Sequence, residues 1–128
     1  KRTKNSDELL YARTKIINAC KACKVDAIDT PFTDTNDYEG LMADTLKAKM
    51  LGFTGKLSIN PRQIDTIHKG YAPSEAEITH AQRVMAAKEE AAKQGLGVFS
   101  LDGKMVDLPI INRAIHTLDM AKLMGLID

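Results

Sequence analysis

The sequence predicts an α/β fold in which short parallel strands alternate with helices. In the first part of the chain, apolar residues recur twice at the three- and four-residue spacing of a buried helix face, and each of these segments is followed by a short β-prone stretch. Strands that alternate with helices of this length are typical of parallel sheets with right-handed helical crossovers. From residue 73 onward the pattern changes to a helix, a hairpin and a second helix. We therefore expect two regions, residues 1–72 and 73–128.

The first region has a start signal at each expected helix. Ser6 is the expected N-cap of the first helix, and Asn36 or a neighbour is expected to cap the second. The Asn60–Pro61 pair is typical of the start of a short helix, because proline is tolerated in a first turn. The expected elements are helix 6–23, strand 25–30, helix 35–51, strand 55–59 and short helix 61–69.

The second region is expected to form a helix–hairpin–helix unit. Ser74 and Glu77 have the spacing of a capping box at the start of its first helix. Asp102 and Gly103 lie between two short apolar stretches and predict a tight hairpin turn with positive φ angles. The expected elements are helix 74–94, hairpin 97–107 and helix 109–125.

The length of the chain limits how much of a closed sheet it can form. Two strands cannot close a sheet, and an eight-stranded α/β barrel needs about 250 residues. The chain has 128 residues and opens with KRTKNSDELL, directly before the first expected helix and without a methionine. We therefore expect a fragment that supplies about the last quarter of such a barrel together with an appended unit.

Composition and charge argue against several classes of function. The 18 Lys and Arg residues balance 17 Asp and Glu to a net charge of +1, without long runs of either sign, which does not favour nucleic acid or anionic membranes as partners. No apolar run is long enough to span a membrane and no leader-type segment precedes the first helix, so we expect a cytoplasmic protein. Cys20 and Cys23 form a C-x-x-C pattern, but at the end of a helix rather than in the strand-to-helix turn of a redox motif.

Polar residues near the two strands are candidates for binding. Asp29 lies at the carboxyl end of the first strand, where parallel α/β sheets place their sites. Lys56 begins the second strand, where a lysine with a buried stem is more often structural. Asn60 follows that strand, and the N–H groups of the next helix could receive a carboxylate or a thioester arm. The histidines lack the spacing of metal ligands and are expected on the surface: His68, His80 and His116.

Asp107 is the candidate for chemistry in the second region. It follows the hairpin and directly precedes Leu108–Pro109, where the last helix is expected to begin. From spacing alone, its carboxylate either caps that helix or serves a site elsewhere.

Five segments resemble, in order and spacing, the C-terminal portion of the citrate lyase beta subunit family: ELLYART, AIDTPFTDTND, LGFTGKLSINPRQI, YAPSEAEI and GVFSLDGKMVDLPII. The wider family includes malyl-CoA and citramalyl-CoA lyases and commonly has histidine in place of Asn60, so Asn60 and Arg62 favour citrate lyase proper. The resemblance implies the last two βα units of a (β/α)8 TIM barrel, with the two expected strands as its seventh and eighth. Residues 73–128 would then form a C-terminal lid.

The resemblance also implies an activity. A citrate lyase of this type cleaves a citryl thioester to oxaloacetate and an acetyl thioester in a retro-Claisen reaction assisted by Mg2+. Asp107 would be the catalytic acid or base, and Asn60, Asp29 and Lys56 would bind the substrate and its thioester. The metal ligands of the family lie on earlier strands, so we expect no metal site in these 128 residues and no activity from the fragment alone.

The implied cofactors and partners follow from the same resemblance. The thioester arm would belong to an acyl carrier protein or to coenzyme A. The other citrate lyase subunits, including the acyl carrier protein, would be partners, and the lid would cover a neighbouring subunit of a homo-oligomer. Cleavage of malyl-CoA or citramalyl-CoA is the alternative activity. A non-catalytic interaction module that binds a carrier protein is the alternative of a different class.

Overall fold

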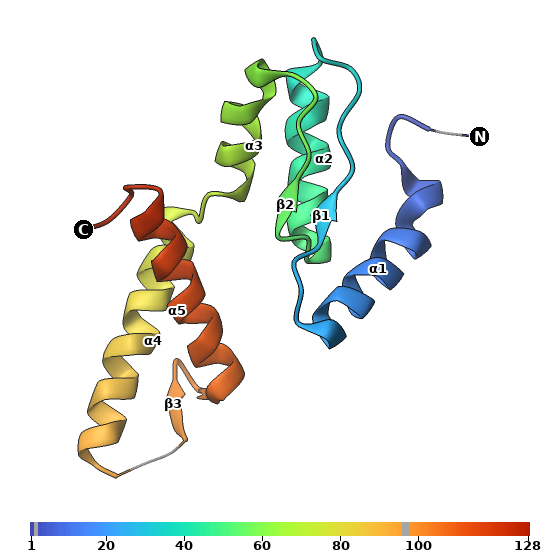
Figure 1. Ribbon diagram of the computed structural model, residues 1–128. Helices are drawn as coiled ribbons and strands as arrows, with labels where there is room; N and C mark the ends of the chain where they lie inside the picture. Colours follow the sequence, from blue (N-terminus) through green and yellow to red (C-terminus); the bar gives the residue numbers. More distant parts are fainter. Residues whose placement is uncertain (2, 96–97) are drawn as a thin grey trace. The chain divides into compact units, whose positions relative to one another are not determined.

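The computed structural model describes residues 1, 3–95 and 98–128. The chain divides into two compact units, Lys1–Tyr71 and Ala72–Asp128 (Figure 1). Each unit has a hydrophobic cluster of its own. Together they give a helix-rich mixed α/β structure.

The first unit contains one pair of parallel strands among the described residues, joined by a helix. Ile28 pairs with Gly55 and Asp29 pairs with Lys56, so the parallel arrangement predicted from the alternation is confirmed. The elements are η1 (Asp7–Leu9), α1 (Leu10–Cys23), β1 (Ile28–Asp29), α2 (Tyr38–Leu51), β2 (Gly55–Lys56), η2 (Pro61–Gln63) and α3 (Ile64–Tyr71).

Both strands are shorter than the predicted 25–30 and 55–59. A strand extends only where its backbone groups meet a partner strand, and here β1 and β2 pair only with each other among the described residues. The N–H of Val25 bonds instead to the carbonyl of Cys20 at the end of α1. The N–H of Ile59 bonds to the side chain of Gln63 at 3.2 Å. Local contacts therefore replace the ladder at both places.

The helix starts differ in part from the predictions. Ser6 has a left-handed backbone with φ of 53° and makes no side-chain cap bond, so the predicted cap is wrong and a short 3-10 turn precedes α1. Its hydroxyl cannot reach the first free N–H groups because a cap needs an extended backbone. Asp37, the neighbour of Asn36, caps α2 by accepting from the N–H of Gly40 at 2.9 Å.

Helices α1 and α2 cover one face of the strand pair. Ala27, directly before β1, is buried with Ile17 of α1, Ala48 of α2 and Phe53. Alternate residues of a strand point to the same face, so Asp29 also faces the helices. Ile28 points to the opposite face and is about half exposed. The strand pair therefore has a helix-facing side and an open side.

The second unit is the predicted helix, hairpin and helix: α4 (Glu75–Lys93), β3 (Phe99–Leu101), β4 (Lys104–Val106) and α5 (Leu108–Leu123). The predicted capping box between Ser74 and Glu77 is present. Asp102 and Gly103 have φ angles of 51° and 74°, as their hairpin turn requires. The first residue of the predicted hairpin, 97, lies outside the described residues. The core consists of Ala81, Val84, Val106, Ile111 and Ala114.

No helix in the described part of the chain combines the length and the apolar character needed to cross a membrane.

The contact between α2 and α3 requires glycine at position 70. A Cβ there would lie 2.6 Å from Cγ2 of Thr45, which is fully buried. We expect Gly70→Ala to lower the unfolding free energy by about 1–3 kcal/mol, although alanine in an open helix stabilises by up to about 1 kcal/mol. Thr45→Ser removes the clashing methyl group and keeps the hydroxyl bond to Leu41. Urea unfolding should show partial recovery in the double variant, and equal losses in both backgrounds would contradict this packing.

Candidate functional site

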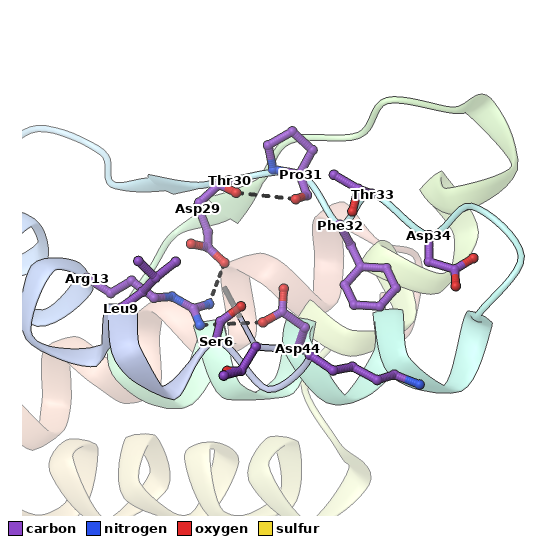
Figure 2. A pocket seen from close by; sticks show the side chains of 12 residues that line it. Ser6, Leu9, Arg13, Asp29, Thr30, Pro31, Phe32, Thr33, Asp34 and Asp44 are labelled. Carbon is purple, nitrogen blue, oxygen red and sulfur yellow. Dashed lines mark hydrogen bonds and ion pairs between the residues drawn. The ribbon is translucent and has the colours of Figure 1, made fainter. Parts of the chain in front are cut away.

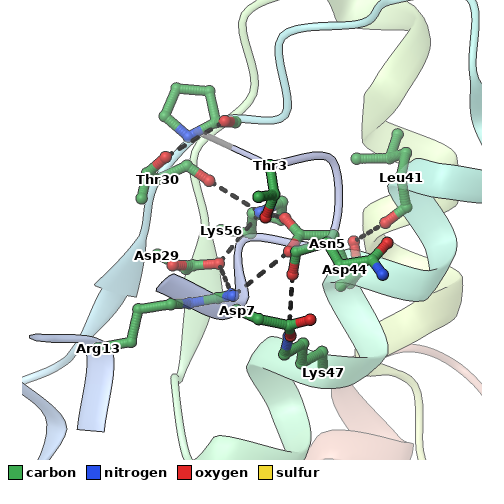
Figure 3. Close-up of polar contacts among 12 residues, drawn as sticks. Thr3, Asn5, Asp7, Arg13, Asp29, Thr30, Leu41, Asp44, Lys47 and Lys56 are labelled. Carbon is green, nitrogen blue, oxygen red and sulfur yellow. Dashed lines mark hydrogen bonds and ion pairs between the residues drawn. The ribbon is translucent and has the colours of Figure 1, made fainter. Parts of the chain in front are cut away.

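Four charged side chains meet on the helix-facing side of the strand pair: Arg13, Asp29, Asp44 and Lys56 (Figure 3). Asp29 and Lys56 are adjacent because they are register partners in β1 and β2. Arg13 comes from α1 and Asp44 from α2. The two helices that cover the strands therefore each supply one charge, and we call these residues the charge cluster.

The charge cluster is largely buried and formally neutral, with Asp44 as its most exposed member. Arg13 Nη2 lies 2.5 Å from Asp29 Oδ2, and Arg13 Nη1 lies 3.4 Å from Asp44 Oδ1. Lys56 Nζ lies 3.1 Å from Asp29 Oδ2 and 2.5 Å from Asp44 Oδ2. The side chains of Lys56 and Asp29 are each 1% exposed. Charges lose hydration on burial, so each of the two cations needs the two nearby anions to offset this cost, and each anion needs the cations.

The charge cluster also fixes the ends of both strands. Lys56 Nζ donates to the carbonyl of Thr30 at 2.8 Å, one residue beyond β1. The N–H of Leu57, one residue beyond β2, donates to the carbonyl of Asp29 at 3.0 Å. The guanidinium of Arg13 lies over the ring of Phe53, 5.6 Å from its centroid. The first residue of each strand-end loop is thus tied to the opposite strand.

Three polar atoms near the charge cluster are buried without a hydrogen-bond partner among the described residues. They are Nε of Arg13, Oδ1 of Asp29 and the hydroxyl of Tyr71. Burial raises the pKa of Tyr71 to about 12, and the negative charge of Asp29 adds to this effect. Tyr71 therefore remains a neutral hydroxyl over the physiological pH range.

A cavity of about 280 Å3 lies beside the charge cluster (Figure 2). The residues after β1, including Thr30, Phe32 and Asp34, form part of its wall, and Arg13 and Asp29 also line it. Its polar lining offers both hydrogen-bond donors and acceptors, which suits a small polar group.

The structure brings together two of the four predicted site residues, Asp29 and Lys56, but both are already engaged in ion pairs. Asn60 caps η2: its Oδ1 accepts from the N–H of Arg62 at 3.0 Å, and its carbonyl accepts from the N–H of Gln63 at 2.9 Å. Two N–H groups that the sequence suggested for anion binding are therefore used locally.

Asp107, the predicted catalytic residue, lies in the second unit. Its carboxylate is exposed and caps α5, with Oδ1 accepting from the N–H of Ile110 at 3.3 Å. Of the two alternatives left open by its spacing, the structure contains the cap, and the catalytic role stays a prediction. The predicted surface positions of the three histidines are confirmed, because all are exposed: His68, His80 and His116.

Sequence reasoning missed Arg13, Asp44 and Gln63. Arg13 lies one helical turn before the buried Ile17, and Asp44 lies one turn before the buried Ala48. Charged residues at core-facing positions of two neighbouring helices were the available signal for an internal ion pair. Gln63, with 1% exposure, had no such signal, because its partners lie in loops whose approach depends on the fold.

The described residues contain no group of three or more His, Cys, Asp or Glu side chains arranged to hold a metal ion. The two carboxylates of the charge cluster are neutralised by Arg13 and Lys56. These residues do not fit a Mg2+ site.

Comparison with known proteins relates the chain to one group of enzymes. A family model described as HpcH/HpaI aldolase/citrate lyase matches residues 1–61. Citrate lyase subunit beta of Escherichia coli (strain K12) is 47% identical over 125 residues, which cover 98% of this chain and 41% of that protein. The mitochondrial citramalyl-CoA lyase of Homo sapiens is 35% identical over 119 residues, covering 93% of this chain and 35% of the relative.

A solved structure is also similar. The protein CitE from Mycobacterium tuberculosis, in complex with magnesium, acetoacetate and coenzyme A, has a TM-score of 0.77 and 33% identity. The match covers 91% of this chain and 42% of that one. The chain thus spans less than half the length of these relatives, and the similarity extends over residues from both units.

Loss of Lys56 should destabilise the first unit strongly. Lys56→Met leaves the buried carboxylate of Asp29 and the partly buried carboxylate of Asp44 with only Arg13, and we expect the unfolding free energy to fall by about 3–5 kcal/mol. The double variant Lys56→Met with Asp44→Leu is neutral again and should recover much of this loss in urea unfolding. Lys93→Met is the matched control, because Lys93 pairs with Glu90 on the surface; it should change stability by less than about 1 kcal/mol. A single variant as stable as this control would disprove the importance of the charge balance.

The hydroxyl of Tyr71 should make the fold sensitive to alkali. The pKa of this hydroxyl is about 12 in the folded protein, whereas the pKa of tyrosine in an unfolded chain is about 10. The unfolded state therefore loses the proton first, and stability should fall as pH rises from about 10 to about 12. Tyr71→Phe should remove this component in unfolding experiments and in tyrosinate absorbance titrations. Tyr11→Phe, at a residue 75% exposed, should not.

Proposed function

Because the HpcH/HpaI aldolase/citrate lyase family model matches residues 1–61 and the chain is similar to citrate lyase beta subunits over nearly all of its own length, we propose that it belongs to this family and forms part of a carbon–carbon lyase of the citrate lyase beta type. The identity of 47% with the Escherichia coli subunit, over 98% of the chain, carries the proposal. The complete enzyme would cleave a citryl thioester to oxaloacetate and an acetyl thioester. In this retro-Claisen step the citryl hydroxyl gives its proton to a base of the complete enzyme and becomes the ketone of oxaloacetate. The electrons of the broken carbon–carbon bond pass to the thioester enolate, which then takes up a proton.

The proposed architecture of the complete enzyme is a (β/α)8 barrel. In it, β1 and β2 are the seventh and eighth strands, and the second unit is a C-terminal lid. The parallel register and the helices on one side of the pair support this arrangement. The open side supports it as well, because Ile28 is about half exposed there. Leu57 and Ile59, in the loop after β2, are also about half exposed, as expected for residues that further strands would cover.

We propose that the complete enzyme uses Mg2+ and a thioester carried by coenzyme A or by an acyl carrier protein. The CitE relative was solved with magnesium, acetoacetate and coenzyme A, which supports the first two. Bound Mg2+ would polarise the oxygen that becomes the ketone. Its ligands would come from outside the described residues. The other citrate lyase subunits would be the partners, in an oligomer whose lid covers a neighbouring subunit.

Asp107 would deliver the proton to the enolate carbon in cleavage and remove it in the reverse direction. Its carboxylate lies at the end of β4, held by the first turn of α5. This placement fixes the direction of the side chain. Closure of the lid over the barrel would remove the carboxylate from water, as acid–base chemistry on a carbon acid requires.

Asn60 would bind the thioester from the loop that follows β2. The sequence also suggested Asp29 and Lys56 for this task. Their burial and mutual ion pair support a different role, in which they hold the strand ends in place from the helix-facing side and do not touch the thioester.

Cleavage of malyl-CoA or citramalyl-CoA is the second candidate. The 35% identity with human citramalyl-CoA lyase supports it. The higher identity with citrate lyase subunit beta and the asparagine at position 60 favour citryl thioesters.

Replacement of Asp107 tests its role in chemistry. Asparagine is as good an N-cap as aspartate, so Asp107→Asn keeps the start of α5 and removes only the carboxylate. In the complete subunit we expect kcat to fall about 100-fold or more, with Mg2+ binding and thermal stability unchanged. Asp102→Asn is the control, because Asp102 is exposed, lies in the hairpin turn and pairs with Arg83. Full turnover in Asp107→Asn would leave Asp107 as a helix cap only.

A further inference from the structure

Gln63 connects the two loops that follow the strands. Its Nε2 donates to the carbonyl of Phe32 in the loop after β1 (residues 30–37), at 2.9 Å. Its Oε1 accepts from the N–H of Ile59 in the loop after β2 (residues 57–60), at 3.2 Å, and from the hydroxyl of Ser58 at 3.4 Å. The side-chain amide of Gln63 thus donates to the loop after β1 and accepts from the loop after β2.

The local sequence aims Gln63 back at these loops. The side chain of Asn60 accepts from Arg62 N–H, Pro61 restricts the first position of η2, and the N–H of Gln63 closes the turn on the carbonyl of Asn60 at 2.9 Å. Asn60 and Gln63 therefore belong to one turn, and a movement of one displaces the other.

Burial makes this connection difficult to replace by water. Gln63 is 1% exposed, so a side chain without an amide would leave the carbonyl of Phe32 and the N–H of Ile59 without these partners in a site of low exposure. Lys56 forms a second connection closer to the strands, where it donates to the carbonyl of Thr30. Two side chains thus connect the ends of the strands and the loops that follow them: Lys56 at the ends of the strands and Gln63 farther along the loops.

We propose that Gln63 is a positioning residue that holds the loop after β1 against the loop after β2 and so sets where Asn60 meets the thioester. This role rests on the proposed lyase function. Gln63 itself touches no substrate. Because a displacement of about 1 Å in a positioned group can reduce a rate about 100-fold, loss of Gln63 should lower turnover even though its side chain touches no substrate.

Two variants of the complete subunit distinguish the effect of the Gln63 bond to Phe32 from that of its bond to Ile59. Gln63→Met has similar size and loses both, whereas Gln63→Glu keeps an oxygen acceptor for Ile59 and loses the donor to Phe32 when ionised. We expect kcat/KM for citryl thioester cleavage to fall about 10- to 100-fold in both, measured well below the unfolding midpoint of each variant. Hydrogen exchange of the Ile59 amide should accelerate in Gln63→Met and stay slow in Gln63→Glu. Gln82→Met, at an exposed position of α4, is the matched control.

The outcomes distinguish positioning from a purely structural role. Lower midpoints with kcat/KM within twofold of the unaltered protein would overturn the proposal, as would unchanged Ile59 exchange in Gln63→Met. If Gln63→Met does not fold, Gln63→Glu decides the matter through its kcat/KM. An unaltered subunit that cleaves none of the citryl, malyl and citramalyl thioesters would disprove the lyase function, while the exchange rates would still report on the connection between the loops.

Discussion

The pairing of Asp29 with Lys56 across two adjacent parallel strands is the interaction on which the first unit depends. Strands of two residues form too few backbone bonds to hold a sheet together. Here the ladder is reinforced by side chains, since Arg13 brings α1 and Asp44 brings α2 to the same two residues. Each cation is neutralised by the two carboxylates and each carboxylate by the two cations, so the strands, the helices and the loops that leave the strands are held by one set of ion pairs.

This arrangement divides the strand pair by function. The helix-facing side contains the charge cluster and the apolar group around Ala27, and it stabilises the unit. The strand-end loops, with Asn60 and the residues after Thr30, are where binding is proposed. In parallel α/β structures, sites lie at the carboxyl ends of strands while the layers between strands and helices supply rigidity. A residue at a strand end can therefore serve the site without touching a ligand, as we infer for Asp29 and Lys56.

Much of the fold could be predicted from the sequence because its signals are local. Ser74 with Glu77 and Asp102 with Gly103 determine a helix start and a turn through neighbouring atoms, and the alternation of helices and short apolar stretches indicated parallel pairing. The strand lengths could not be predicted, because a ladder ends where its partner ends. The same applies to the candidate site: Asp29 and Lys56 were found by position, but their ion pairs with Arg13 and Asp44 depend on residues brought together from different helices. Gln63 was missed because its hydrogen bonds are made to the backbone of two loops that come together only in the folded chain.

The neutrality of the charge cluster has a consequence for encounters in solution. The electric fields of two cations and two anions that lie within a few ångströms of one another cancel at larger distances, so the cluster contributes little to the field outside the molecule. Its buried ion pairs are also screened much less by dissolved salt than exposed pairs are. Attraction of a multiply charged anion, and the dependence of its capture rate on ionic strength, must therefore arise from other charges. In this unit, the ion pairs of the charge cluster stabilise the fold, and the attraction of a ligand depends on charged groups at the surface.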